Sequence, residues 1–214
     1  MTAQTDLDLD DDRLPIGGTT LQCRLAEAAI ELFSSQGAPA TTVREITAAC
    51  GLSPGALYNH FTSKDQLLYV LVRDIHRQFD ARMAAVVAGA DLDPAAQLAT
   101  TVRFLVAHTA GGKKRSRFAN REFTALTGPR RQEVILLRRQ IRDRLTGILV
   151  TGSEAGTFAL AGGDNLTAAT LTAVTITTMC GHISEWTLEN YPLSLSHLQD
   201  RYVEMAFRIA GADA

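Results

Sequence analysis

The stretch GLSPGALYNHFTSKDQLL, residues 51–68, separates two helical patterns with a glycine and a proline. Gly51 favours the end of one short helix, and Pro54, directly after Ser53, favours the start of the next. Gly55 has no side chain, so the backbone at this point can approach another molecule closely. Two short helices joined by a tight turn that contains glycine are typical of a helix-turn-helix, in which the second helix enters the major groove of DNA.

The segments around this turn predict further helices. Apolar residues recur every three or four positions, Thr42 and Glu45 form a capping box, and Ser53 is in place to cap the helix that follows it. We expect N-terminal helices at about Thr19–Gly37, Thr42–Cys50, Ser53–Phe61 and Ser63–Met83.

The rest of the chain continues in the same period, without a competing strand pattern. Helices are expected at about Pro94–Thr109, Ser116–Leu126, Gly128–Gly156, Asp164–Asn190 and Ser194–Gly211. The sequence therefore predicts an all-α protein in three parts. These are a disordered acidic arm at residues 1–18, a three-helix helix-turn-helix domain at residues 19–65, and an all-helical domain at residues 66–214.

Composition narrows the class of protein. Of the 214 residues, 46% are hydrophobic, which is enough for a sizeable core. We find no apolar run near the roughly 20 residues that a membrane helix needs, so no membrane association is expected. Cys23, Cys50 and Cys180 are scattered without the spacing of metal ligands. They favour buried apolar roles in a reducing cytoplasm, and no metal site is predicted.

Charge is distributed unevenly along the chain. The net charge is −2, and five aspartates lie within the first 12 residues. Residues 103–144, in contrast, hold twelve Lys or Arg residues against three acids, a net charge of +9. Such a block is typical of a solvated face, and it would also suit an anionic ligand or the acidic arm.

Side chains around the turn have the chemistry to contact DNA. Thr42 and Ser53 present hydroxyl groups at helix starts, where the helix dipole favours phosphate. Lys64 adds a positive charge at the start of the fourth helix. Tyr58 and His60 are amphipathic and can reach the oxygens of a DNA backbone.

Residues 24–71, RLAEAAIELFSSQGAPATTVREITAACGLSPGALYNHFTSKDQLLYVL, resemble the N-terminal domain of TetR-family transcriptional repressors. The resemblance implies a homodimer that inserts the third helix of each subunit into the major groove of a palindromic operator. It carries phosphate or base contacts onto Thr42, Arg44, Ser53, Gly55, Tyr58, Asn59, His60 and Lys64. Base contacts are expected from Arg44, Gly55, Ala56 and Asn59.

The same resemblance implies that the remainder of the chain binds a small effector and forms the dimer, without a cofactor. The predicted helix Asp164–Asn190 is rich in threonine and alanine, whose small side chains permit close helix packing. We expect this helix to form the dimer interface together with the last helix. A core role within a monomer is the alternative.

Aromatic side chains with polar groups at helical spacing predict where the effector binds, because small-molecule sites are apolar cavities with a few placed polar groups. A core role is the alternative at each of these positions. The predicted ligand residues are Phe104, His108, Phe118, Arg121, Glu122, His182 and Trp186.

A second resemblance concerns residues 117–158 and the segment GHISEW, residues 181–186. Both are similar to TetR-family members that sense acyl-CoA thioesters in lipid or sterol breakdown. This would explain the basic stretch, because arginine and lysine complement the phosphates of coenzyme A. Some such regulators have arginine where this chain has His182, so an uncharged hydrophobic effector stays open as the alternative.

Two other classes of protein compete with a regulator. The electrostatic signal for DNA is weak, since residues 13–65 carry four basic and four acidic side chains, and a helical adaptor that binds protein would suit this balance. The five histidines could serve an enzyme as bases. No nucleophile elbow, metal pair or phosphate loop accompanies them, so the sequence predicts no catalytic residues.

Overall fold

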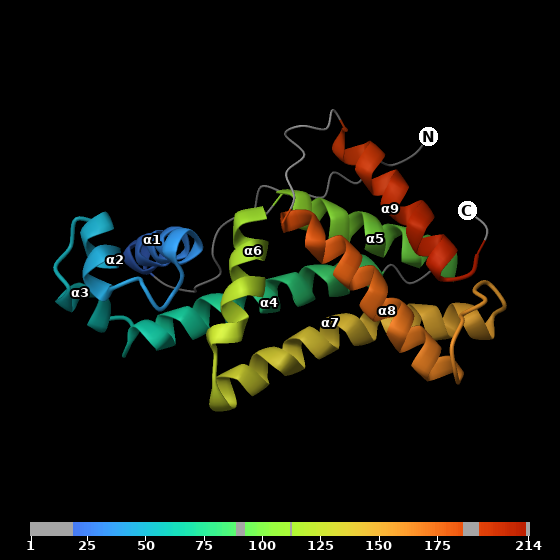
Figure 1. Ribbon diagram of the computed structural model, residues 1–214, viewed down its shortest axis with the longest axis horizontal. Coiled ribbons are helices and arrows are strands. Elements are labelled where there is room, and N and C mark those ends of the chain that lie inside the picture. Colours follow the sequence, from blue (N-terminus) through green and yellow to red (C-terminus); the bar gives the residue numbers. More distant parts are fainter. Residues whose placement is uncertain (1–18, 89–92, 112, 186–192, 213–214) are drawn as a thin grey trace.

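The computed structural model describes residues 19–88, 93–111, 113–185 and 193–212. Over these residues the chain is all-α, as predicted, and no strand is present among them. Figure 1 labels the helices α1 (Thr20–Gln36), α2 (Val43–Ala49), α3 (Gly55–Tyr58), α4 (Lys64–Val87), α5 (Pro94–Gly111), α6 (Lys113–Glu122), α7 (Gly128–Glu154), α8 (Asn165–Gly181) and α9 (Leu195–Ile209). Two 3-10 helices, η1 (Phe123–Ala125) and η2 (His182–Glu185), follow α6 and α8.

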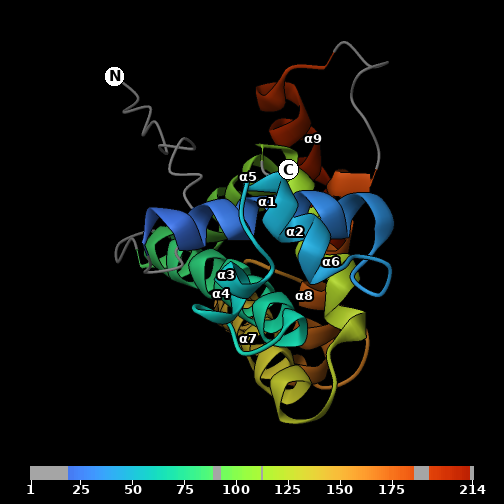
Figure 2. The same ribbon diagram turned by 90° about the vertical axis from the view of Figure 1, so that its left-hand side faces the viewer.

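Helices α1 to α3 gather at one end of the molecule (Figures 1 and 2). The predicted capping box at the start of α2 is present, and Thr19 forms a second one with Gln22 at the start of α1. Gly51 ends the second helix region with φ +69°, a backbone angle that favours glycine. This local chemistry fixes where the first two helices begin and end.

The third helix is shorter than the sequence predicts. It ends at Tyr58 instead of Phe61, and Pro54, not Ser53, occupies its N-cap without a side-chain hydrogen bond. The prediction that Ser53 caps this helix was wrong. A single turn of helix depends on tertiary contacts for its position, and Leu57 and Phe61 supply them because both are buried.

Two hydrophobic cores meet along α4. One joins α1, α2, α3 and the first half of α4 to α6, where the ring of Phe118 stacks on that of Phe33 with centroids 6.0 Å apart. The other joins the end of α4, at Met83, to α5, α7, α8 and α9. Ion pairs fasten α4 to α7: Arg77 Nη2 lies 2.8 Å from Glu133 Oε1, and Arg144 Nε lies 2.8 Å from Asp80 Oδ1. Helix α4 is therefore shared by both parts of the molecule.

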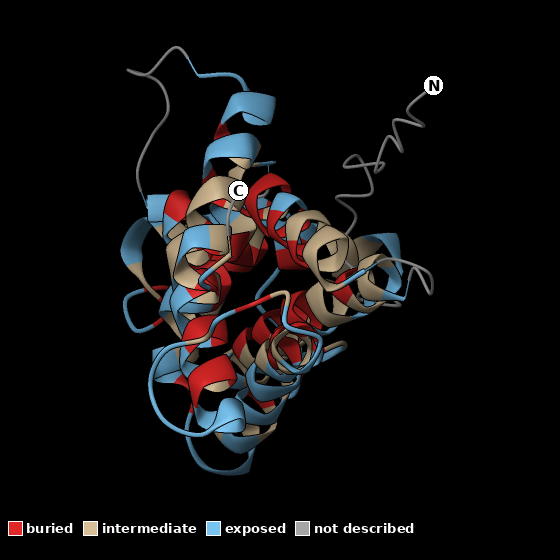
Figure 3. Cartoon of the chain, turned by 90° about the vertical axis from the view of Figure 1, so that its right-hand side faces the viewer, coloured by how far each residue is buried: buried red, intermediate tan, exposed pale blue. Residues whose placement is uncertain are grey.

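The C-terminal helices form a bundle whose inner faces are buried and whose outer faces are exposed (Figure 3). Helix α8 crosses α7 and α5, and α9 lies against α5 (Figure 1). The threonine-rich helix was predicted to reach Asn190, but α8 ends at Gly181 and continues as η2 to Glu185. Residues 186–192, which include Trp186, lie outside the described residues.

One segment, Asn165–Glu185, has the length and apolarity of a membrane-crossing helix, since an 18-residue window in it has a mean hydropathy of 1.3. The sequence predicts no segment of this kind, and by length and composition that prediction was wrong. Core helices of globular proteins pass the same test, and α8 buries Ala169, Ala173 and Ile176 in the second core. Its apolar composition has a structural explanation within the bundle.

Candidate DNA-binding surface and ligand cavity

The predicted DNA contacts lie together on α2, α3 and the adjoining turns, at the end of the molecule seen in Figure 2. The tip of this surface is exposed, and the side chain of Tyr58 is 57% exposed. Ala56, His60 and Lys64 are partly buried. The remaining predicted contacts are exposed: Thr42, Arg44, Ser53, Gly55 and Asn59.

The hydroxyl of Thr42 is already engaged within the protein. It accepts a hydrogen bond from Glu45 N at 3.2 Å and donates one to Glu45 Oε2 at 2.7 Å. The same carboxylate oxygen accepts from Thr42 N, and these bonds lower the pKa of Glu45. A phosphate at the start of α2 would therefore meet a helix end that Glu45 already caps.

The ammonium group of Lys64 also has partners within the protein. Its Nζ donates to Ala38 O at 2.6 Å and to Thr41 O at 2.7 Å. These two carbonyls lie in the link between α1 and α2, so the bonds fasten that link to the start of α4. In this structure Lys64 positions the DNA-binding surface.

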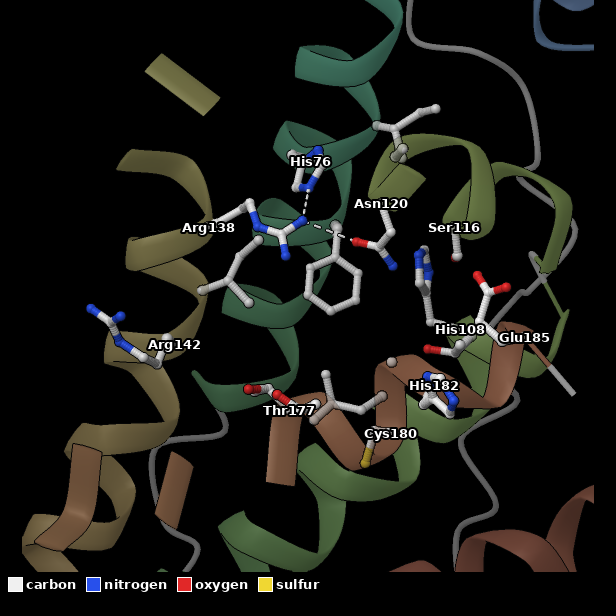
Figure 4. A pocket seen from close by; sticks show the side chains of 18 residues that line it. His76, His108, Ser116, Asn120, Arg138, Arg142, Thr177, Cys180, His182 and Glu185 are labelled. Atoms are coloured by element: carbon white, nitrogen blue, oxygen red, sulfur yellow. Dashed lines mark hydrogen bonds between the residues drawn. The ribbon is translucent and has the colours of Figure 1, made fainter. Parts of the chain in front are cut away.

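A cavity of about 340 Å³ lies between α4, α5, α6, α7 and α8 (Figure 4). Ile75, Phe79, Leu105 and Ile141 supply its apolar wall. Its polar lining residues are His76, His108, Thr109, Ser116, Asn120, Arg138, Arg142, Thr177, Thr178, His182 and Glu185. This mixture is typical of a site for a small amphipathic molecule.

Three polar side chains from three helices meet at one end of this cavity. Arg138 Nη1 donates to His76 Nε2 at 3.3 Å and to Asn120 Oδ1 at 3.0 Å, so its guanidinium lies between them in Figure 4. His76 is buried, and burial lowers its pKa to about 4, with the Arg138 charge adding to the effect. The imidazole is therefore neutral at pH 7.

A second neutral histidine lines the cavity from α5. Burial, together with the nearby charge of Arg82, lowers the pKa of His108 to about 4. Its ring packs against Phe79, with centroids 4.7 Å apart, and against Phe104 at 5.8 Å. Phe104 is fully buried and packs behind these rings, so it supports the cavity wall without lining the cavity itself.

The structure separates the predicted ligand residues. His108 and His182 line the cavity. Phe118 packs in the first core, Arg121 is exposed, and Glu122 Oε2 accepts a hydrogen bond from Ala38 N at 3.3 Å. These three do not line the cavity, and Trp186 lies outside the described residues.

His76, Asn120 and Arg138 line the cavity and are not among the ligand residues predicted from the sequence. His76 and Arg138 are 62 residues apart, and each looks like an ordinary polar residue of its own helix. Only the crossing of α4, α6 and α7 brings the three together. In the described part of the chain, no three His, Cys, Asp or Glu side chains gather as a metal site.

Two family models match the chain. The model described as "Bacterial regulatory proteins, tetR family" matches residues 25–70, and the model described as "Tetracyclin repressor-like, C-terminal domain" matches residues 91–210. The second match alone covers more than half of the chain.

Curated relatives of the chain are also transcriptional regulators by name. The chain is 49% identical over 45 residues to the uncharacterized HTH-type transcriptional regulator YerO of Bacillus subtilis, covering 21% of this chain and only 16% of YerO. It is 28% identical over 151 residues to the HTH-type transcriptional repressor KstR2 of Rhodococcus jostii, covering 66% of this chain and 70% of KstR2. The match to YerO thus spans far less than two thirds of that protein.

Solved structures share the whole architecture. A bacterial regulatory protein of the tetR family from Rhodococcus superposes with a TM-score of 0.84 at 28% identity, covering 92% of this chain and all of that one. AibR, solved in complex with isovaleryl coenzyme A and operator DNA, gives a TM-score of 0.77 at 23% identity and covers 86% and 96% of the two chains. The likeness to AibR is one of fold alone. The two family models show that the chain belongs to the TetR family of transcriptional regulators and that its helix-turn-helix is the DNA-binding unit of that family.

Proposed function

We propose that this protein is a cytoplasmic, homodimeric repressor that binds a palindromic operator and releases it when a small amphipathic effector enters the cavity. The observation that carries this proposal is that α4 belongs to both sites. It begins at Lys64, which holds the link of the DNA-binding surface, and its middle lines the cavity with Ile75, His76 and Phe79.

A second connection supports coupling between the two sites. Helix α6 lines the cavity with Ser116 and Asn120, and its Phe118 stacks on Phe33 of α1. Helix α6 also contacts η2, where Arg117 Nε donates a hydrogen bond to Ser184 O at 2.9 Å. A ligand that moves α6 or α4 would therefore change the position of α1 to α3. A coupling of about 1–3 kcal/mol would change operator affinity roughly 5–150-fold.

The proposed dimer uses the outer face of α8 together with α9. Leu166, Leu171 and Val174 lie exposed on α8, at 63%, 56% and 40%. A row of apolar side chains of this size is typical of an interface that a second copy covers. Two copies would place their third helices about 34 Å apart, one turn of DNA.

The proposed effector is an acyl-CoA thioester, as in the complex of AibR with isovaleryl coenzyme A. The KstR2 relative, a repressor by name, supports the direction of control. An uncharged hydrophobic compound is the second candidate, because the cavity wall of Ile75, Phe79, Leu105 and Ile141 would hold it equally well.

A DNA-release assay tests the proposal. The dimer is bound to a duplex selected from the region upstream of its own gene, and acyl-CoA thioesters of increasing chain length are titrated in. Release at micromolar concentrations by the thioesters, and not by coenzyme A alone, is expected. If the dimer binds a thioester in the cavity while its affinity for DNA stays constant, release by this effector is excluded.

A further inference from the structure

The guanidinium of Arg138 is held by neutral groups only. Both hydrogens of Nη1 are used, one on His76 Nε2 and one on Asn120 Oδ1. Among the described residues, no carboxylate lies within ion-pair distance of Arg138, and the Nε–H and Nη2–H groups have no hydrogen-bond partner. The edge that forms bidentate bonds to a carboxylate or phosphate is therefore available in a residue that lines the cavity.

The other charged groups of the cavity are already paired. Arg142 Nη2 lies 3.1 Å from Asp143 Oδ1, and Glu185 Oε2 lies 3.8 Å from Arg117 Nε. Arg138 differs from both, since it has no ion pair among the described residues; its guanidinium carbon lies 4.9 Å from the centroid of the Phe123 ring. By surface area Arg138 is an exposed residue, but the groups packed around its guanidinium still desolvate it enough to lower its pKa. A partly desolvated cation is stabilised when an anion pairs with it.

His76 fixes the orientation of this cation. Its Nδ1 lies 2.8 Å from Val72 O, the carbonyl one turn earlier in α4, and a ring nitrogen facing a carbonyl must carry the hydrogen. Nε2 is then a bare acceptor, and it faces Arg138 Nη1. His76 and Asn120 are positioning residues that leave the opposite edge of Arg138 free.

We propose that Arg138 binds an anionic oxygen group of the effector, while the apolar body of the effector lies against Ile75, Phe79, Leu105 and Ile141. This inference rests on the proposed function and narrows its ligand to an amphipathic acid. The anionic group is either the carboxylate of a free acid or a phosphate of the coenzyme A part of an acyl-CoA thioester. Both groups can form bidentate hydrogen bonds to a guanidinium.

A matched pair of probes tests the charge preference without a known effector. Anilinonaphthalene sulfonate has an apolar body with one anionic group, and N-phenyl-1-naphthylamine is nearly the same body without it. We expect Arg138→Gln to weaken binding of the sulfonate about tenfold or more and to leave the neutral probe unchanged. Arg139→Gln, which removes an exposed arginine outside the cavity lining, is the control and should bind both probes as the unaltered protein does.

The positioning role of His76 has its own readout. His76→Phe should weaken the sulfonate, and His76→Gln should restore most of the affinity because its amide oxygen can accept from Arg138. Equal affinity of the unaltered protein and Arg138→Gln for the sulfonate would overturn the proposal, as would an equal loss of both probes, which indicates a collapsed cavity.

Displacement of the sulfonate then separates the two sources of the anion. If octanoate displaces the sulfonate, the anion is the carboxylate of a free acid. If octanoyl coenzyme A displaces it and octanoate does not, the anion belongs to a thioester. Displacement by neither would refute the assignment to acyl acids. These binding measurements contain no DNA, so they test the anion site alone. A failure of the release mechanism would appear only in the DNA-release assay.

Discussion

Gly152 lacks a side chain, and this allows the chain that follows α7 to pack closely against the helix. A Cβ atom at this position would lie 2.2 Å from two ring carbons of Phe158, whose side chain is buried. Gly152→Ala is expected to destabilise the protein by about 1–3 kcal/mol, because the ring of Phe158 must move. The measurement is urea unfolding followed by circular dichroism.

Gly147 provides the matched control in the same helix. A Cβ there meets nothing within 4 Å, so Gly147→Ala should stabilise the protein by up to about 1 kcal/mol through helix propensity. Equal effects of the two substitutions would show that the ring of Phe158 does not restrict Gly152.

His76 makes stability depend on pH. Its pKa is about 4 in the folded protein and 6.5 in the unfolded chain. As pH falls below 6.5, the unfolded chain takes up a proton that the folded protein does not, so the free energy of unfolding decreases until about pH 4. The loss between pH 7 and pH 5 is about 2 kcal/mol for this histidine.

The substitution His76→Gln should remove this part of the acid sensitivity. Urea unfolding at the two pH values is expected to show a smaller decrease for the variant, and His108 should account for much of the decrease that is left. Parallel losses in the variant and the unaltered protein would mean that His76 titrates normally.

Single residues also mark the limit of prediction from sequence. The burial of Leu57 and Phe61 follows from their spacing of four, a local pattern. The partners of Lys64 and Glu122 do not follow from any pattern, because Ala38 lies 26 and 84 residues away from them in the chain. For the same reason some predicted ligand residues lie outside the cavity: helical spacing identifies a face and leaves open what that face contacts.

At the scale of the element, helices with strong end signals were predicted well. The caps Thr19, Thr42, Ser63 and Asp164 each accept a backbone hydrogen bond as their residue types suggest. The length of α3 was overestimated because this single turn has no side-chain cap. The length of α8 was overestimated because its apolar period continues into η2. Periodicity therefore locates a helix, and its ends depend on particular hydrogen bonds.

Lys64 offers a prediction about the link between elements. Lys64→Met keeps the length of the side chain and removes the bonds to Ala38 O and Thr41 O. We expect a loss of stability of about 1–3 kcal/mol and weaker DNA binding. The slope of log affinity against log salt should stay unchanged, because no phosphate contact is lost.

Arg44→Ala is the comparison for this experiment. Its side chain is exposed on α2, and removal of this positive charge from the DNA interface should reduce the salt slope by about one, whether Arg44 contacts a base or a phosphate. If Lys64→Met reduces the slope by the same amount, Lys64 leaves its carbonyl partners on binding and contacts the DNA backbone.

At the scale of the whole molecule, the two cores connect the cavity of the proposed effector to the distant DNA-binding surface. The first core includes Phe118 and Val134 from α6 and α7, so it extends well beyond the predicted boundary at residue 65. The division at residue 65 stays a prediction, and the structure shows that packing crosses it. Motion of α4 would therefore move the DNA-binding helices as a body.

The proposed dimer gives the prediction at this scale. Leu171 and Leu136 are both 56% exposed, but Leu171 lies on the outer face of α8 and Leu136 on α7. Leu171→Glu should place a charge in the dimer interface and produce a monomer in sedimentation experiments, while Leu136→Glu should leave the dimer intact. Because two half-sites must be bound together, the monomer should also lose most of its affinity for an operator. A Leu171→Glu protein that stays dimeric would place the interface elsewhere, and a Leu136→Glu protein that dissociates would place it on α7.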